Sequence, residues 1–70
     1  MDKSIEYKGY TIRIENNKKD KYYPVIAVAR NGITELRKRG YDESQAIMLV
    51  ESEIDFIISM QINNKKEVGN

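Results

Sequence analysis

The spacing of apolar residues changes once along the chain, near Gly40, and this change restricts the folds that the chain can adopt. Before Gly40, apolar and polar residues alternate, most clearly over residues 10–15. A period of two indicates half-buried strands. After Gly40, apolar residues recur every three or four positions, as on an amphipathic helix. We therefore predict an α+β fold in which a three-stranded antiparallel β-meander (β-β-β-α order) precedes one C-terminal α-helix packed on one face of the sheet.

Turn signals divide the predicted meander, residues 5–41, into its strands. We expect strands at about residues 10–15, 22–30 and 33–40. Because the apolar phase changes at Lys8-Gly9, residues 5–15 form either one kinked strand or a short arm that leads into a strand. The polar residues 16–21 form a loop, and Asn31-Gly32 predicts a two-residue hairpin with positive φ at both positions. Few apolar residues and many charges place strand 33–40 at an edge of the sheet.

The segment Asp42-Glu43-Ser44-Gln45 is typical of a helix start. Asp42 can accept hydrogen bonds from free backbone N–H groups, and Gln45 can reach back toward the residues before the helix. We predict a helical segment at 42–62, with the helix itself over about 43–61. Helix-poor residues follow, so residues 63–70 are expected to be a frayed tail. The whole chain, 1–70, is expected to form a single domain.

One apolar stripe of the predicted helix suits packing on the sheet. This inner stripe covers an arc of about 120°. It consists of Ala46, Ile47, Val50, Ile54, Ile57 and Ile58. We expect Val50, Ile54 and Ile57 to be buried against the inner face of the sheet. The sheet residues that should meet them are Tyr10, Ile12, Ile14 and the inward-facing residues of 25–29.

A second stripe, Leu49, Phe56 and Met60, is interrupted by Glu53 and widens the apolar arc to about 200°. One small sheet does not need so wide a surface. We predict that these three residues meet a partner chain, most simply a second copy in a homodimer. Association also suits a 70-residue chain that has no cysteine for a disulfide. In the alternative, the same residues lie under the N-terminal arm of a monomer, with Ile5 and Tyr7.

The residue types leave little scope for catalysis. The chain has no histidine and no cysteine, which removes the commonest general base and the usual transition-metal ligands. It has no phosphate-binding glycine loop and no nucleophile elbow. Glu51 and Asp55 stand four residues apart, as expected of a solvated helix face. We expect no enzyme activity, cofactor or metal site. With no apolar run long enough for a bilayer and no secretion signal, we expect a cytoplasmic protein without a membrane partner.

Charge is unevenly distributed along the chain. Residues 1–41 carry a net charge of +5 and residues 42–70 one of −4, giving the overall +1. Six cations of the first part form a candidate nucleic-acid contact, since Tyr22 and Tyr23 beside the loop lysines and Tyr41 after the arginines offer rings for stacking. They are Lys18, Lys19 and Lys21 in the loop and Arg37, Lys38 and Arg39 on the edge strand. In the alternative, the edge strand is charged to prevent other strands from adding to it.

The segment Gly40-Tyr41-Asp42-Glu43-Ser44-Gln45-Ala46 and the order of elements resemble the small N-terminal domain of HicB-like antitoxins. There, three strands precede a helix that begins after a short Gly-polar-Thr/Ser stretch followed by an acidic residue and alanine. Gly40, Ser44 and Ala46 stand at comparable positions, and the resemblance covers residues 5–60. The family's Gly-Cys turn and a DNA-binding segment after the helix are missing. The resemblance therefore implies the fold and not the antitoxin role. The chain looks equally like other standalone β-β-β-α proteins of bacteria and phages.

These observations favour a non-catalytic protein–protein interaction module, a small bacterial or phage accessory or inhibitory protein that binds an unidentified protein partner. The alternative is a nucleic-acid-binding regulator that uses the basic edge strand and loop.

Overall fold

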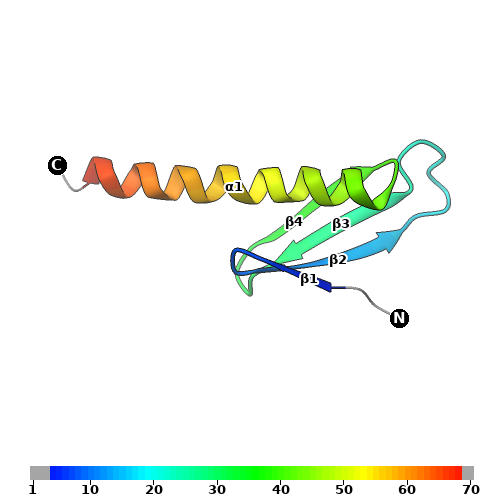
Figure 1. Ribbon diagram of the computed structural model, residues 1–70, viewed down its shortest axis with the longest axis horizontal. Coiled ribbons are helices and arrows are strands. Elements are labelled where there is room, and N and C mark those ends of the chain that lie inside the picture. Colours follow the sequence, from blue (N-terminus) through cyan, green and yellow to red (C-terminus); the bar gives the residue numbers. More distant parts are fainter. Residues whose placement is uncertain (1–3, 69–70) are drawn as a thin grey trace.

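The computed structural model describes residues 4–68 and the side chains of residues 4–62. An antiparallel sheet is covered on one face by a single long helix (Figure 1). The elements are β1 (Ser4–Tyr7), β2 (Tyr10–Asn16), β3 (Val25–Arg30), β4 (Glu35–Gly40) and α1 (Glu43–Val68). The strands lie in the sheet in the order of the sequence, so the sheet is a meander. The predicted α+β class and the C-terminal helix are confirmed, but the sheet has four strands instead of three.

The additional strand arises at Lys8-Gly9, where the expected kink is a complete reversal of the chain. Lys8 and Gly9 have φ angles of 49° and 88°, and Tyr7 pairs with Tyr10 across the turn. Two successive positive φ angles are typical of the tight turns that join antiparallel strands. The reversal explains the change of apolar phase, because Ile5 and Tyr7 pair with Ile12 and Tyr10 and share their side of the sheet. Of the two alternatives, one kinked strand over residues 5–15 is wrong, and the short arm that leads into β2 is itself a paired strand, β1.

The loop at Asn31-Gly32 is longer than the predicted two-residue turn. Arg30 pairs with Glu35, so residues 31–34 form the loop and β4 begins at residue 35 instead of 33. Gly32 has a φ of 90°, whereas Asn31 does not have the predicted positive φ. Instead, the Oδ1 atom of Asn31 accepts hydrogen bonds from the backbone N–H groups of Ile33 (3.0 Å) and Thr34 (2.7 Å). Asn31 thus closes the turn with its side chain.

Helix α1 begins at the predicted residue and ends later than predicted. The backbone N–H of Gln45 donates to Oδ1 of Asp42 (2.8 Å), and the side chain of Gln45 accepts from the backbone N–H of Tyr41 (2.8 Å). This reciprocal arrangement closely follows a capping box. The helix continues to Val68, so the expected frayed tail is helical up to this residue. Residues 69–70 lie outside the described part of the chain.

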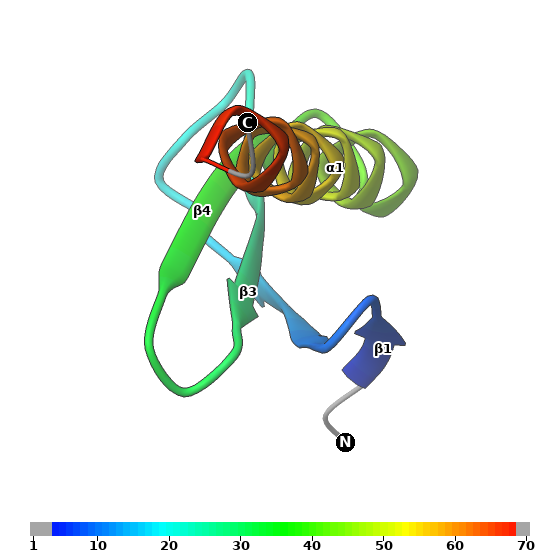
Figure 2. The same cartoon turned by 90° about the vertical axis from the view of Figure 1, so that its left-hand side faces the viewer.

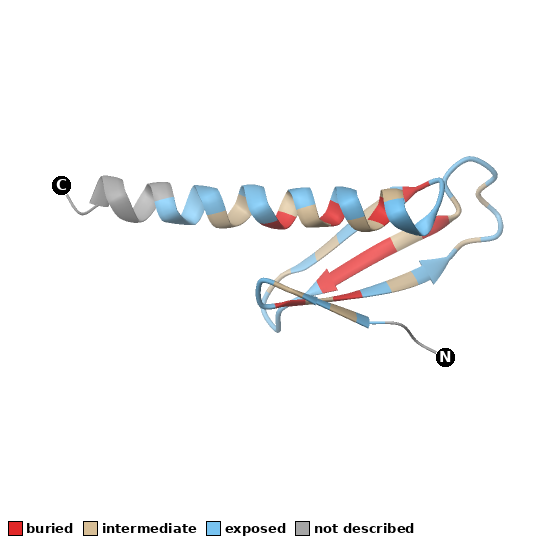
Figure 3. Cartoon of the chain, in the orientation of Figure 1, coloured by how far each residue is buried: buried red, intermediate tan, exposed pale blue. Residues whose placement is uncertain are grey.

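The hydrophobic core lies between α1 and the central strands β2 and β3 (Figure 3). Its helix residues are Ala46, Val50 and Ile54, and its strand residues are Tyr10, Ile12, Val25, Ala27 and Ala29. The predicted burial of Val50 and Ile54 is confirmed. Ile57 is only half-buried, about one turn beyond Ile54, which is the last fully buried residue among the described side chains of α1. The core therefore supports only the first part of the helix.

The remaining part of α1 extends beyond the sheet (Figure 1), and Figure 2 looks along the helix with this part toward the viewer. The helix has 26 residues, which corresponds to a length of about 39 Å. The longest strand has seven residues, or about 23 Å. Within residues 4–68, no helix is both long and apolar enough to cross a lipid bilayer.

Candidate interaction surfaces

The side chains of Leu49, Phe56 and Met60, which we call the outer stripe, are exposed on α1. Their exposed fractions are 37%, 61% and 48%. The alternative that placed them under the N-terminal arm is wrong, because Ile5 and Tyr7 pack instead against the edge of the core. The structure therefore leaves the outer stripe accessible to a partner.

One feature favours contact with a partner at the outer stripe. Glu53, which interrupts the stripe in the sequence, is half-buried, and its Oε1 atom lies 3.4 Å from Nζ of Lys38 on β4. The charge at this position is therefore partly balanced. Ile62 is also exposed, but it lies about 140° around the helix from the outer stripe and does not extend it.

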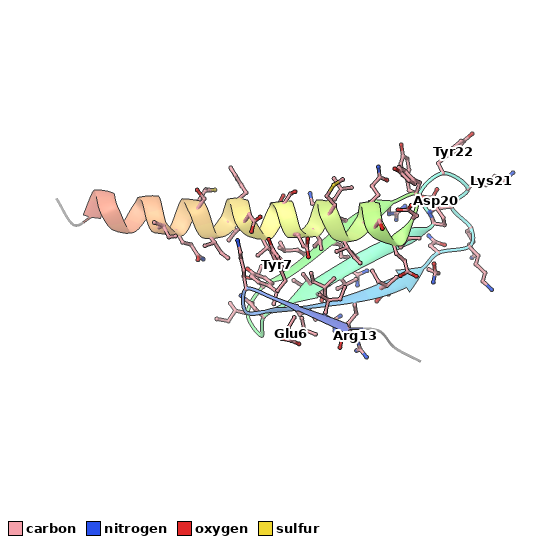
Figure 4. All side chains as sticks on the ribbon, viewed as in Figure 1. Glu6, Tyr7, Arg13, Asp20, Lys21 and Tyr22 are labelled. Atoms are coloured by element: carbon pink, nitrogen blue, oxygen red, sulfur yellow. The ribbon has the colours of Figure 1, made fainter. Side chains whose placement is uncertain are left out.

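A polar cluster joins the β1–β2 hairpin to α1. The hydroxyl of Tyr7 donates to both carboxylate oxygens of Asp55 (2.9 and 3.0 Å), and Nζ of Lys8 donates to Oδ1 (2.7 Å). Figure 4 shows the side chain of Tyr7 reaching from the hairpin toward the helix. From the sequence, Asp55 is expected on a solvated helix face, because no local pattern relates residues 7 and 8 to residue 55. The cluster positions the hairpin beside the core.

This cluster predicts a pH dependence of stability at both ends of the scale. Hydrogen bonds from Lys8 and Tyr7 lower the pKa of Asp55, while the bonds to Asp55 raise the pKa of Tyr7 and of Lys8. The contribution of Asp55 is complete above its unfolded pKa of about 4 and is lost as the pH falls through its folded pKa. The contributions of Tyr7 and Lys8 are complete below about pH 10 and are lost as the pH rises further.

We expect Asp55→Asn to lower the melting temperature slightly near pH 7 and to reduce its dependence on pH below about pH 4. The effect is small because the groups are exposed and screened by solvent. Thermal unfolding followed by circular dichroism between pH 2 and pH 7 measures it. Identical acid profiles for wild type and variant would contradict a role for the cluster in stability.

The loop between β2 and β3, residues 17–24, is held in one conformation by the side chain of Asp20. Its Oδ1 atom accepts the backbone N–H groups of Tyr22 (3.0 Å) and Tyr23 (2.9 Å), and its Oδ2 atom accepts Nη1 of Arg39 (3.0 Å). These contacts lower the pKa of Asp20, with the two backbone N–H groups as the main cause. The two backbone contacts tie the loop to itself, and the contact with Arg39 ties it to β4.

The structure brings together four of the six predicted basic residues and separates the other two. Lys18, Lys19 and Lys21 are exposed on the loop, and Arg39 reaches the loop through Asp20. Lys38 lies on the helix side of β4, where it meets Glu53.

Arg37 lies on the open face of the sheet, beside two carboxylates. Its guanidinium is 3.0 Å from Glu35 and 3.6 Å from Glu15. Arg30 also contacts Glu35, at 2.7 Å. The cations of this part of the open face are therefore balanced by neighbouring carboxylates. These ion pairs agree with a charged edge that needs no ligand.

Three tyrosines are exposed at the end of the sheet that carries the loop. Tyr22, Tyr23 and Tyr41 have exposed fractions of 78%, 51% and 61%. Tyr41 directly follows Gly40, which pairs with Val25 at the other end of the loop. A shallow hollow beside the loop is lined by Asn17, Lys19, Asp20, Lys21 and Tyr22, and Figure 4 shows Tyr22 pointing away from the body of the molecule. The fold thus places Tyr41, which follows the basic edge strand in the sequence, at the same end of the sheet as the two loop tyrosines.

The chain matches no protein-family model, and comparisons with curated proteins and with solved structures also found no match. The resemblance to HicB-like antitoxins stays a prediction. Among the described residues, no cluster of three or more carboxylates is arranged to hold a metal ion.

Proposed function

We propose that the protein is a non-catalytic interaction module that forms a homodimer through the outer stripe of α1. The observation that carries this proposal is the exposure of Leu49, Phe56 and Met60 on a helix that extends beyond its sheet. A dimer of this kind suits a small cytoplasmic accessory or inhibitory protein of a bacterium or phage, whose further partner is another protein.

The length of α1 supports association. Isolated helices of two or three turns are marginally stable in water, because most helix stability in proteins comes from packing of an apolar face. Among the side chains of α1 that the structure describes, the last fully buried one is that of Ile54, and the helix continues to Val68. Contact with a second helix would supply the packing that the sheet does not give to this segment.

A twofold axis near Phe56 would bring the outer stripes of two copies together. Phe56 would then lie beside its own counterpart, and the largest exposed apolar side chain of the helix would be removed from water. In an antiparallel pair, the apolar residues on either side of Phe56 also face the partner helix. The contact is made twice, so one substitution changes both halves of the interface.

We expect Phe56→Glu to convert a dimeric wild type into a monomer, because it places two carboxylates at the centre of the contact. Sedimentation velocity over a range of protein concentrations measures the change. Met48→Glu is the matched control, since Met48 is 57% exposed on α1 but lies about 100° around the helix from the outer stripe. This variant should remain dimeric. A wild type that stays monomeric at high concentration would rule the proposal out.

A further inference from the structure

We propose that the loop end of the sheet binds single-stranded nucleic acid. We use this name for the surface formed by Lys18, Lys19, Lys21, Tyr22, Tyr23, Arg39 and Tyr41. In this proposal the cations contact phosphates and the tyrosine rings stack on bases. The proposal is independent of the homodimer, because none of these residues belongs to the outer stripe.

The loop end carries exposed positive charge. The loop contains one carboxylate, Asp20, and its oxygens already accept two backbone N–H groups and the guanidinium of Arg39. The charge of Asp20 is thus offset by its own contacts. The three loop lysines are exposed, and their positive charge remains directed to solvent. A polyanion that passes the loop can contact all three.

Three tyrosine side chains are exposed at the loop end. Tyr7 packs against the core and Tyr10 is part of it, whereas Tyr22, Tyr23 and Tyr41 are exposed together at the loop end. An exposed aromatic ring offers a flat apolar face, and stacking on such faces is tolerant of base sequence. Rings beside lysines are the combination that single-strand binding surfaces use.

The residue types at the loop end indicate the class of partner. Protein interfaces are depleted in lysine, so three lysines beside the rings favour phosphate over a protein surface. A duplex hides the faces of its bases, so the tyrosines could not stack on them. The carboxylate of Asp42 lies at the same end, but it accepts the backbone N–H of Gln45 as the cap of α1. The combination of free rings and lysines therefore fits an unpaired strand best.

Hydrogen bonds within the protein hold the loop in place. The loop is closed by backbone hydrogen bonds from Asn17 to Pro24 (2.6 Å) and from Asp20 to Asn17 (3.1 Å). The side chain of Asp20 also holds the loop through its contacts with the backbone of the loop and with Arg39. A ligand therefore meets a surface that is already arranged, and little entropy is lost in ordering the loop on binding.

Fluorescence anisotropy with a labelled single-stranded oligothymidine of about a dozen nucleotides, at low salt, tests the proposal. We expect the oligonucleotide to bind. The logarithm of the binding constant should fall linearly with the logarithm of the salt concentration, with a slope of about −0.7 for each phosphate contacted. Tyr22→Ala should weaken binding roughly tenfold. Tyr22→Phe should bind as the wild type does, because it keeps the ring.

Two lysine variants separate the loop end from general positive charge. Lys19→Gln should weaken binding and reduce the salt slope by about 0.7. Lys38→Gln removes the same charge from the helix side of β4 and should have little effect on binding. Absence of binding at low salt would overturn the proposal. Equal affinity for the matching duplex, or equal losses for the two lysine variants, would overturn it as well. Phe56→Glu should retain binding per chain, so this proposal and the homodimer can fail separately.

Discussion

Ile54→Ala is expected to lower the free energy of unfolding by about 2–5 kcal/mol, which is a large share of the stability of so small a domain. Ile54 has no exposed surface and lies in the core, as do Val50 on α1 and Ile12 on β2. Over residues 43–62, where side chains of the helix are described, it is the last fully buried residue. The substitution would leave a cavity where α1 last makes full contact with the sheet, and little nearby structure can collapse into it.

Denaturant unfolding at one fixed protein concentration measures this loss, since association makes apparent stability depend on concentration. Ile54→Val should cost only about 0.5–1.5 kcal/mol, because it removes one methyl group. Met48→Ala serves as the exposed control on the same helix and should change stability little. A midpoint that is the same for wild type and Ile54→Ala would show that Ile54 is not part of the core.

Elements with a strong apolar period could be predicted from the sequence. The alternation over residues 10–15 identifies β2 because one face of the sheet is buried and the other is solvated. The start of α1 follows from Asp42 and Gln45, whose hydrogen bonds are local and need no tertiary contact. Val50 and Ile54 could be assigned to the core because helical spacing places them on one face.

The turns were harder to predict because different backbone solutions share the same residues. At Lys8-Gly9, a bulge and a hairpin both change the apolar phase, and the observed turn requires a positive φ from a lysine, which seldom adopts one. At Asn31, the side chain forms hydrogen bonds within the loop, and these bonds compete with the positive φ of a two-residue turn. Sequence alone does not decide either competition.

The end of the helix was placed too early because propensity is a weak signal. Asn63 and Asn64 are poor helix formers, but each costs only a fraction of a kcal/mol relative to alanine. After them, the first strong helix breaker in the sequence is Gly69. A helix already in progress can cross two asparagines, and α1 continues to Val68.

The candidate surfaces were predicted unevenly, for reasons of distance along the chain. The outer stripe depends on helical spacing alone, so its three residues could be grouped from the sequence. The link between Asp20 and Arg39 joins residues from different elements, and it required the actual path of the loop. Tyr7 and Lys8 are farther still from Asp55 in the sequence, and no local pattern indicates their contact.

The close approach of α1 to β4 explains why Gly40 and Ala46 are small. A Cβ atom placed on Gly40 would lie 2.5 Å from the backbone nitrogen of Ala46 and 2.9 Å from its Cα atom. Ala46 itself is fully buried. Two of the three positions on which the HicB-like resemblance depends are therefore required by packing at this junction. Any helix that turns back over its strand so closely would need similarly small residues.

Gly40→Ala is expected to destabilise the protein by about 1–3 kcal/mol, and Gly40→Val by at least as much, because the atoms in the way are backbone and cannot move aside cheaply. Gly40 does not have a positive φ, so the cost comes from bulk. Gly32 is the matched control: a Cβ there meets nothing within 4 Å, but its φ is 90°. At Gly32, asparagine should be tolerated better than alanine, because asparagine accepts positive φ more readily. At Gly40, the larger asparagine should be worse than alanine. Denaturant unfolding of the alanine and asparagine variants at Gly32 and Gly40 measures which substitution is less destabilising at each site. The same ranking at both sites would contradict the steric explanation.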